Sequence, residues 1–305
     1  MSRLYRTWFD RVAPPEYAAL LDGSAEIVAD LADAEAIVAS GLLRCDGALM
    51  DRAPGLRVVS RTGIGVDNIS IEDATARHVA VCNLPDGPTI STAEHALTLL
   101  LATAKRLRHA ERAVREGRAG YFAEHEGIEL CGLTLGLVGL GRIGARMAAY
   151  GRALGMRVVG YDPFAGETDV ERLETLDDLL AVSDVVSLHA PATPATRRMI
   201  DPRRMKRGAI LVNAARGALV DEAALLEALD RGHLGGAGLD VFDPEPPDPA
   251  SRLLAHDRVV ATPHVASATS AAKDRMWRGA IAQALQVLRG ERPPHLVNEE
   301  VWPAG

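Results

Sequence analysis

Three side chains suited to proton transfer and anion binding lie in the second half of the chain, each just after an apolar run that predicts a strand. They are Arg216, Glu245 and His264. A histidine titrates near neutral pH and can give a proton to a developing alkoxide. A carboxylate beside the ring fixes its tautomer, and a guanidinium holds a substrate carboxylate in bidentate fashion. Each residue alone could be an ordinary loop or surface residue, but the three together favour a site that reduces a 2-oxo acid.

A second feature, residues 133–162, has the pattern of a dinucleotide-binding unit. It consists of an apolar run, the turn GLGRIG at residues 139–144, a helix-like segment and a second apolar run that ends on Asp162. Gly139 permits the tight turn, Gly141 lets the backbone approach a pyrophosphate, and Gly144 lets the helix pack closely on the strand. The free amides at the helix start then bind the phosphates.

Asp162 predicts which dinucleotide binds. It falls 18 residues after Gly144, close to the spacing of a ribose-binding carboxylate. A carboxylate accepts hydrogen bonds from ribose hydroxyls and repels a 2′-phosphate, whereas NADP sites usually place an arginine nearby. Residues 163–166 contain no cation. The sequence therefore predicts NAD in preference to NADP.

The composition of the chain limits its class. Its 305 residues suit two domains, and 48% hydrophobic with 25% charged residues is typical of a globular protein. A net charge of −7 argues against nucleic-acid and anionic-membrane partners. Cys45, Cys82 and Cys131 have no metal-ligand spacing and are interpreted as small buried side chains, so we expect no metal site. Because no apolar run resembles a signal peptide or a membrane span, we expect a cytoplasmic protein.

Alternating strand-like and helix-like segments predict two α/β regions with parallel sheets. The predicted fold is a doubly wound Rossmann domain over residues 99–285, inserted in a smaller, flavodoxin-like substrate domain made of residues 1–98 and 286–305. Two long helices, at about residues 91–117 and 271–288, are expected to cross between the domains.

The helix and strand ends are predicted from local signals. Ser91 and Glu94 form a capping-box pattern at the start of the first long helix, and residues 295–298 are expected to return to the first domain as a short strand. Strands of the first domain are predicted at residues 4–8, 26–29, 36–38, 56–60 and 79–82. Six strands are predicted in the second domain: the two of the dinucleotide unit and residues 185–189, 210–213, 238–242 and 259–262.

Over nearly its whole length the chain resembles the NAD-dependent D-2-hydroxyacid dehydrogenases, the family that includes phosphoglycerate, glycerate and D-lactate dehydrogenases. The resemblance rests on RTGIGVDN at residues 61–68, GLGRIG at 139–144, SDVVSLHAP at 183–191, NAARG at 213–217, LDVFDPEP at 239–246 and TPH at 262–264.

This resemblance implies roles for individual residues. His264 would be the proton donor in reduction and the base in oxidation, Glu245 its carboxylate partner, and Arg216 the ligand of the substrate carboxylate and carbonyl. Substrate binding would also involve Arg61 and the backbone around Ile64 and Gly65. Besides the glycines and Asp162, the implied cofactor contacts are Arg142, Ile143, Ala190, Pro191, Ala214, Ala215 and Asp240. The family also implies a homodimer formed through the nucleotide domain.

The substrate and two alternative functions stay open. Ala39 stands where phosphoglycerate-type members often carry a basic residue, which favours a small 2-oxo acid such as hydroxypyruvate or glyoxylate, although Arg61 remains available as a cation for a phosphate. One alternative is an NAD(H)-sensing binding protein similar to a corepressor, and the other is a dehydrogenase of the formate or phosphite type. Of the remaining histidines, His95 and His189 are interpreted as structural.

Overall fold

The computed structural model describes residues 4–302 and divides the chain into two compact units. The first unit is Met1–Pro88 with Ala268–Gly305, and the second is Thr89–Ser267. These boundaries precede the expected ones at residues 98/99 and 285/286, because each long helix belongs to the unit whose sheet it packs against. Helix α4 (Thr89–Ala104) packs on the second sheet, and helix α10 (Ser270–Arg289) packs on the first.

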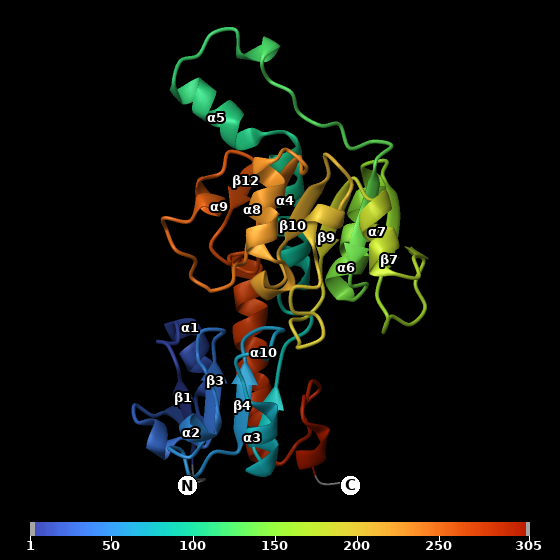
Figure 1. Ribbon diagram of the computed structural model, residues 1–305. Coiled ribbons are helices and arrows are strands. Elements are labelled where there is room, and N and C mark those ends of the chain that lie inside the picture. Colours follow the sequence, from blue (N-terminus) through green and yellow to red (C-terminus); the bar gives the residue numbers. More distant parts are fainter. Residues whose placement is uncertain (1–3, 303–305) are drawn as a thin grey trace. The chain divides into compact units, whose positions relative to one another are not determined.

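The first unit contains a parallel sheet of five strands in the order β2-β1-β3-β4-β5, with α10 against it (Figure 1). All five predicted strands are present. They are β1 (Tyr5–Phe9), β2 (Ala25–Ile27), β3 (Ala36–Ala39), β4 (Val58–Arg61) and β5 (Ala80–Cys82). The shorter helices are α1 (Pro15–Ala18), α2 (Gly47–Met50) and α3 (Ile71–Ala76). The strand order is that of a flavodoxin-like sheet, as predicted.

The core of the first unit forms where α10 covers the sheet. Trp277 of α10 is buried and stacks on Tyr17, with ring centroids 5.6 Å apart and an interplanar angle of 8°. The predicted strand at residues 295–298 is wrong: Leu296 forms only an isolated bridge with Cys82. The pairing stops there because the side chain of Asn298 accepts the hydrogen bond of the Val81 amide at 2.8 Å.

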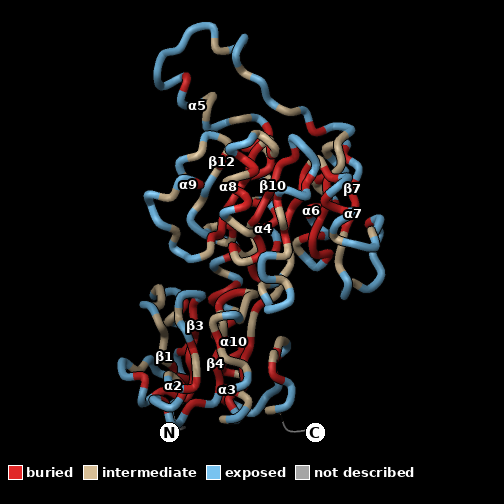
Figure 2. The backbone as a smooth tube through the Cα atoms, in the orientation of Figure 1, coloured by how far each residue is buried: buried red, intermediate tan, exposed pale blue. Residues whose placement is uncertain are grey.

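The second unit contains a parallel sheet of seven strands in the order β12-β11-β10-β9-β6-β7-β8. The six predicted strands are present, as β6 (Thr134–Val138), β7 (Arg157–Tyr161), β9 (Val185–Leu188), β10 (Ile210–Asn213), β11 (Gly236–Leu239) and β12 (Val259–Ala261). The seventh, β8 (Glu171–Arg172), was not predicted, because it has two residues and both are exposed. Figure 2 shows that the central strands are buried, as expected for a sheet covered on both faces.

The helices of the second unit follow the predicted alternation with one correction. They are α4, α5 (Leu107–Arg115), α6 (Arg142–Ala153), α7 (Leu176–Val182), α8 (Glu222–Asp230) and α9 (Arg252–Ala255). The single helix expected over residues 91–117 is wrong, because Arg106 adopts a left-handed backbone with φ of 48° that separates α4 from α5. Ser91 is not an N-cap, since α4 begins two residues earlier and buries it.

The described residues also test the expectations from composition. In residues 4–302 no helix combines the length and apolarity needed to cross a membrane, and no group of His, Cys, Asp or Glu side chains is placed to hold a metal ion. Cys45 and Cys82 are buried, as predicted. Cys131 is exposed, so that part of the prediction is wrong. Cys131 lies just before the glycine turn that leads into β6 and therefore stays at the surface.

Candidate active site

The carboxyl ends of the second sheet carry all three predicted acid–base and anion-binding residues. Every strand pair in this sheet is parallel, so the loops after the strands leave from one edge. Arg216 follows β10, Glu245 follows β11, and His264 follows β12. Since these strands are neighbours in the sheet, the three loops are adjacent. Ligands in open α/β sheets bind at such an edge.

His264 and Glu245 are in direct contact. The Nδ1 atom of His264 lies 2.7 Å from Oε1 of Glu245, and the two side chains are 46% and 36% exposed. Both groups are therefore hydrogen-bonded to each other and still reachable from solvent. The backbone of His264 is left-handed, with φ of 53°, a conformation uncommon outside glycine. Neighbouring groups must hold the histidine in this conformation.

Asp240 holds the His264 segment in place. Its carbonyl accepts the His264 amide at 2.7 Å, and its two carboxylate oxygens accept the amides of Val265 and Ala266 at 2.9 and 2.8 Å. The Thr262 hydroxyl donates to the same carboxylate at 2.6 Å, and His95 lies 2.9 Å from that hydroxyl. Asp240 is thus connected to every residue from 262 to 266 except Pro263.

The carboxylate of Asp240 is fully buried and stays charged. Burial alone would raise its pKa, but hydrogen bonds from His95, Thr262 and the two amides together hold the pKa below its usual value. Donors of the protein itself thus form hydrogen bonds to both carboxylate oxygens of Asp240. The structure therefore places Asp240, which the family resemblance implied as a cofactor contact, against the segment that carries His264.

The loop that carries Glu245 is held from the neighbouring strand. Gly217 lies so close to the backbone of Phe242 that a Cβ atom there would come within 2.0 Å of the Phe242 carbonyl carbon. The amide of Asp243 donates to Glu222 at 2.9 Å, and the Asp243 carboxylate pairs with Arg197 at 2.9 Å. Burial raises the pKa of Glu222, against the opposing effect of the Asp243 amide. These contacts determine where Glu245 lies relative to the loop after β10.

Arg216 leaves the end of β10 through a turn organised by Asn213. The buried Asn213 side chain accepts the Ala215 amide at 3.0 Å and donates to the Arg216 carbonyl at 2.9 Å. The guanidinium of Arg216 is half-buried, and its Nη1 donates to the Ala215 carbonyl at 2.7 Å. Ala214 and Ala215, the predicted cofactor contacts, are half-buried in this same turn.

The glycine turn between β6 and α6 has the geometry that its sequence predicts. Gly139 has φ of 95°, and a Cβ atom there would lie 2.7 Å from the carbonyl carbon of His189. A Cβ on Gly144 would lie 2.2 Å from the Gly139 carbonyl oxygen, so only glycine lets the helix begin this close to the turn. Among residues 4–302, apart from Gly141 itself and its two chain neighbours, no atom lies within 4 Å of a Cβ built on Gly141. The open side of Gly141 fits the approach of a pyrophosphate.

The remaining predicted residues of this half also fit a dinucleotide. Arg142 and Ile143 form the first turn of α6, whose N-cap is Gly141 and has no side chain to satisfy the free amides. Asp162 follows β7, beside β6, and its two oxygens accept the amides of Leu140 and Phe164, both at 2.9 Å. Each oxygen keeps a lone pair for a ribose hydroxyl. The residues present therefore suit NAD, with backbone amides for phosphate and a carboxylate for ribose.

His189 lies between the two halves of this edge, at the end of β9. Its backbone contacts Gly139, and its ring nitrogen Nε2 lies 2.9 Å from the hydroxyl of Ser187. Burial lowers the pKa of His189 to about 4, so the ring is neutral at pH 7. Of the next two residues, which were predicted cofactor contacts, Ala190 is half-buried and Pro191 is exposed.

The predicted substrate residues Arg61, Ile64 and Gly65 belong to the first unit. Arg61 ends β4, and its guanidinium passes between two glycines: a Cβ on Gly41 would lie 2.8 Å from its Nη2, and one on Gly63 would lie 2.3 Å from its Nη1. The Ile64 carbonyl accepts a hydrogen bond from the Asn83 side chain at 2.8 Å. These residues thus lie at the end of β4 and in the loop that follows it.

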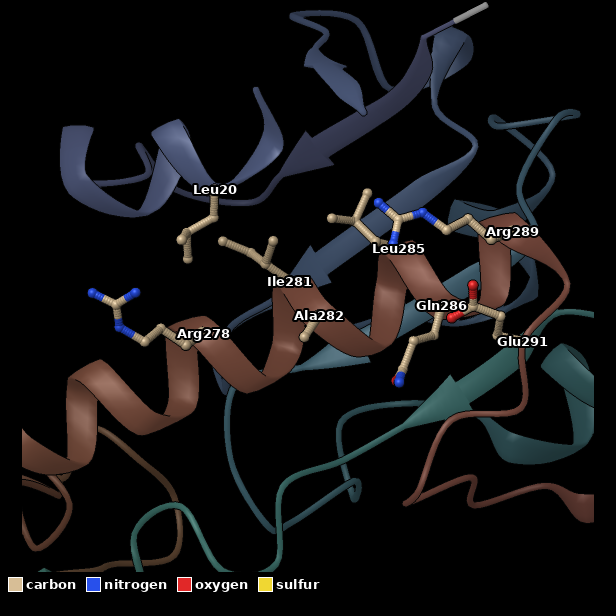
Figure 3. A pocket seen from close by; sticks show the side chains of 8 residues that line it. All are labelled: Leu20, Arg278, Ile281, Ala282, Leu285, Gln286, Arg289 and Glu291. Atoms are coloured by element: carbon tan, nitrogen blue, oxygen red, sulfur yellow. The ribbon is translucent and has the colours of Figure 1, made fainter. Parts of the chain in front are cut away.

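A pocket of about 420 Å³ lies in the first unit. Figure 3 shows the side chains that line it along one side of α10. Leu20, Ile281 and Leu285 supply apolar surface, with Arg278 at one end and Arg289 at the other. Both arginines already have partners, since Arg278 binds Asp274 at 2.8 Å and Arg289 binds Ser24 at 2.9 Å. None of the predicted cofactor or catalytic residues lines this pocket.

Sequence reasoning missed one charged residue near Asp162. Arg172, on the unpredicted strand β8, donates from Nη2 to the Asp162 carbonyl at 2.9 Å and from Nη1 to the Ala165 carbonyl at 3.1 Å. The prediction of NAD in preference to NADP considered only residues 163–166 and therefore missed a cation that lies farther along the chain. The sequence around β8 carries no period-2 signal, because two adjacent charged residues separate the apolar Val170 and Leu173.

Comparison with known proteins agrees with this geometry. Residues 97–266 match the family described as D-isomer specific 2-hydroxyacid dehydrogenase, NAD binding domain. The chain belongs to this family. It is 43% identical over 286 residues to the glyoxylate reductase of Korarchaeum cryptofilum, covering 90% of this chain and 86% of that enzyme.

Two further relatives show how far the similarity extends. The chain is 44% identical over 255 residues to the D-3-phosphoglycerate dehydrogenase of Archaeoglobus fulgidus, covering 81% of this chain but 48% of that enzyme, about half of its length. The NADPH-dependent glyoxylate/hydroxypyruvate reductase of Sinorhizobium meliloti, solved with NADP and malonate, is 30% identical with a TM-score of 0.89, covering 99% of both chains. The predicted family, fold class and NAD-type cofactor are confirmed, and the roles of individual residues stay predictions.

Proposed function

We propose that this dehydrogenase interconverts a small 2-oxo acid and its D-2-hydroxy acid, with His264 as the proton donor and acceptor. The observation that carries the proposal is the 2.7 Å contact between His264 and Glu245, with Arg216 on the loop of the neighbouring strand. An imidazole, a carboxylate and a guanidinium at adjacent strand ends are the groups that ketone reduction beside a carboxylate requires.

Each residue has a distinct part in the proposed reaction. Bound NADH supplies the hydride. Arg216 holds the substrate carboxylate and polarises the carbonyl, because a guanidinium offers several donors in a planar fork. Glu245 accepts a hydrogen bond from Nδ1 of His264, which leaves Nε2 to give its proton to the oxygen of the reduced carbonyl. In oxidation the same nitrogen takes the proton back. Asp240 positions His264 by accepting the backbone amides of residues 264–266.

We propose glyoxylate or hydroxypyruvate as the substrate. Ala39, at the end of β3, is buried and has only a methyl side chain, so it offers no cation to a phosphate group. The similarity to glyoxylate reductases over most of their length supports the same choice. In the first unit, the backbone at Ile64 and Gly65 would bind the substrate carboxylate, and Arg61 would remain available as a cation beside it.

The proposal is tested by following NADH absorbance with a panel of phosphorylated and unphosphorylated 2-oxo acids. We expect oxidation of NADH with glyoxylate or hydroxypyruvate, and at least ~100-fold lower kcat in the His264→Gln variant with unchanged NADH affinity. A matched control is His233→Gln, because that side chain can still donate to the Met205 carbonyl, which lies 2.8 Å away in the native protein. Undiminished turnover in His264→Gln would contradict the mechanism. NADH binding without turnover on any acid would favour a binding protein.

We further propose that the protein is a homodimer that uses the segment around α5. This segment projects from the body of the second unit in Figure 1 and exposes Leu107, Val114 and Phe122, whose exposed fractions are 57%, 81% and 96%. Several large apolar side chains exposed on one projecting segment favour an interface there. Sedimentation equilibrium should give twice the chain mass for the native protein and the chain mass for Val114→Asp/Phe122→Asp. A native monomer would contradict the proposal.

A further inference from the structure

A positively charged side chain, that of Arg172, lies beside Asp162, although the binding of NAD requires no cation there. Arg172 lies on the edge strand β8, which pairs with β7, and its guanidinium reaches the loop that follows β7. There it binds two carbonyl oxygens, those of Asp162 and Ala165. Among the residues that the structure describes, Arg172 makes no ion pair, whereas its neighbour Glu171 pairs with Arg157 at 2.6 Å. The charge of Arg172 is therefore not neutralised.

The position of this charge corresponds to one feature of the cofactor. In a dinucleotide site the carboxylate after the second strand binds the ribose 2′-hydroxyl, and NADP sites place an arginine nearby for the 2′-phosphate. In this protein the carboxylate after the second strand is that of Asp162, and Arg172 donates a hydrogen bond to the backbone carbonyl of the same residue. A guanidinium with two N–H groups on carbonyls still has three for phosphate oxygens.

We propose that Arg172 forms a 2′-phosphate subsite, so that the enzyme accepts NADPH as a second, less favoured cofactor. This inference rests on the proposed function of the cofactor site. Asp162 opposes the subsite, because its carboxylate repels the phosphate while it binds the ribose hydroxyls of NADH. Two opposite charges, one on the loop after β7 and one on the neighbouring strand β8, therefore set the preference: Asp162 favours NADH, and Arg172 limits how strongly NADPH is rejected.

Adenine nucleotides test the subsite without turnover. In titration calorimetry on the whole protein, Arg172→Gln should weaken 2′,5′-ADP about tenfold, the effect of one charge-assisted hydrogen bond, and change ADP less than twofold. Arg157→Gln is the matched control, since it removes an exposed arginine of the same sheet edge that binds Glu171 and not the loop. Both nucleotides should bind that variant as they bind the native protein.

The alternative is that Arg172 only supports the loop. In that case Arg172→Gln would weaken ADP and 2′,5′-ADP by the same factor, which would overturn the proposal. Equal affinities in the native protein and in Arg172→Gln would overturn it as well. If the native protein bound neither nucleotide, the cofactor site itself would be wrong, and this failure is distinct because it does not depend on Arg172.

A double-variant series separates the two charges. Asp162→Asn removes the repulsion and should raise the affinity for 2′,5′-ADP and the kcat/KM for NADPH relative to NADH. Arg172→Gln/Asp162→Asn should lose most of this gain, because no guanidinium then holds the phosphate. A gain that persists in the double variant would show that other groups bind the phosphate, and the subsite assignment would fall.

Discussion

The two halves of the carboxyl edge of the second sheet are built by opposite means. After β6 and β7 the cofactor half consists of backbone: glycines at 139, 141 and 144, free amides at the start of α6, and one carboxylate at Asp162. After β10, β11 and β12 the acid–base half consists of side chains, Arg216, Glu245 and His264, on three loops. The first half therefore depends mainly on backbone groups and on one carboxylate, whereas the second depends on three side chains from three loops.

An aspartate supports each half, and the two aspartates differ in burial. Asp162 and Asp240 each accept two backbone amides with their carboxylates. Asp162 is half-buried and keeps lone pairs for a ligand, whereas Asp240 is fully buried and takes a further hydrogen bond from Thr262. The comparison teaches that exposure decides what an aspartate of this kind can do: the half-buried Asp162 still has acceptor capacity for a ligand, whereas the buried Asp240 has only protein partners.

The largest effect is expected from a substitution in the glycine turn of the cofactor half. In Gly144→Ala the new Cβ would lie 2.2 Å from the Gly139 carbonyl oxygen, so the start of α6 must move away from the turn. A misplacement of about 1 Å can cost about 100-fold in rate, so we expect kcat/KM to fall by about that factor and NADH affinity to fall with it. Thermal unfolding should also occur at a lower temperature, because the clash exists without cofactor. Steady-state kinetics, fluorescence titration and a melting curve measure these effects.

Gly141→Ala is the matched variant. In the described part of the chain, no atom beyond the two adjacent residues lies within 4 Å of its Cβ, and its φ is −68°, which alanine adopts readily. The melting temperature should therefore change little. NADH affinity should still fall, because the Cβ occupies the space through which the pyrophosphate approaches. If Gly141→Ala lowered the melting temperature as much as Gly144→Ala does, the space beside Gly141 would not be open, and the proposed approach of the pyrophosphate there would be contradicted.

This contrast also explains how much could be predicted from sequence. The glycine turn and Asp162 were predictable because their spacing is local: turn, helix and strand follow one another in 30 residues, and each glycine answers a steric need. Arg216, Glu245 and His264 were predictable because parallel strands bring successive strand ends to one edge. Both inferences use only chain order and strand direction.

The supporting contacts could not be predicted in the same way. Gly217 against Phe242, Glu222 with Asp243, and His95 with Thr262 join residues that are from 21 to 167 positions apart, and their pairing depends on how the loops pack. Arg172 was missed for the same reason, since a two-residue edge strand has almost no periodic signal. Strand order can be predicted from sequence, whereas the contacts between loops require coordinates.

A smaller effect is expected from the support of the acid–base half. In Asp240→Asn a side-chain amide replaces a carboxylate that accepts the amides of Val265 and Ala266, so at least one donor loses its acceptor. Hydrogen bonds to charged groups contribute about 1.5–3 kcal/mol each, and we expect the free energy of unfolding to fall by about 3 kcal/mol. Because the His264 segment loosens, kcat should fall more than NADH affinity. Urea unfolding and steady-state kinetics measure these changes.

The pH dependence of the lost unfolding free energy shows whether the charge of Asp240 or its packing stabilises the protein. The pKa of Asp240 is lowered in the folded protein, so its carboxylate stabilises the fold above its unfolded pKa of about 3.9, and that contribution disappears as pH falls through the folded pKa. The difference in unfolding free energy between the native protein and Asp240→Asn should therefore be full at pH 7 and shrink below about pH 4. A difference that stays constant with pH would mean that packing, and not the buried charge, holds the catalytic loop.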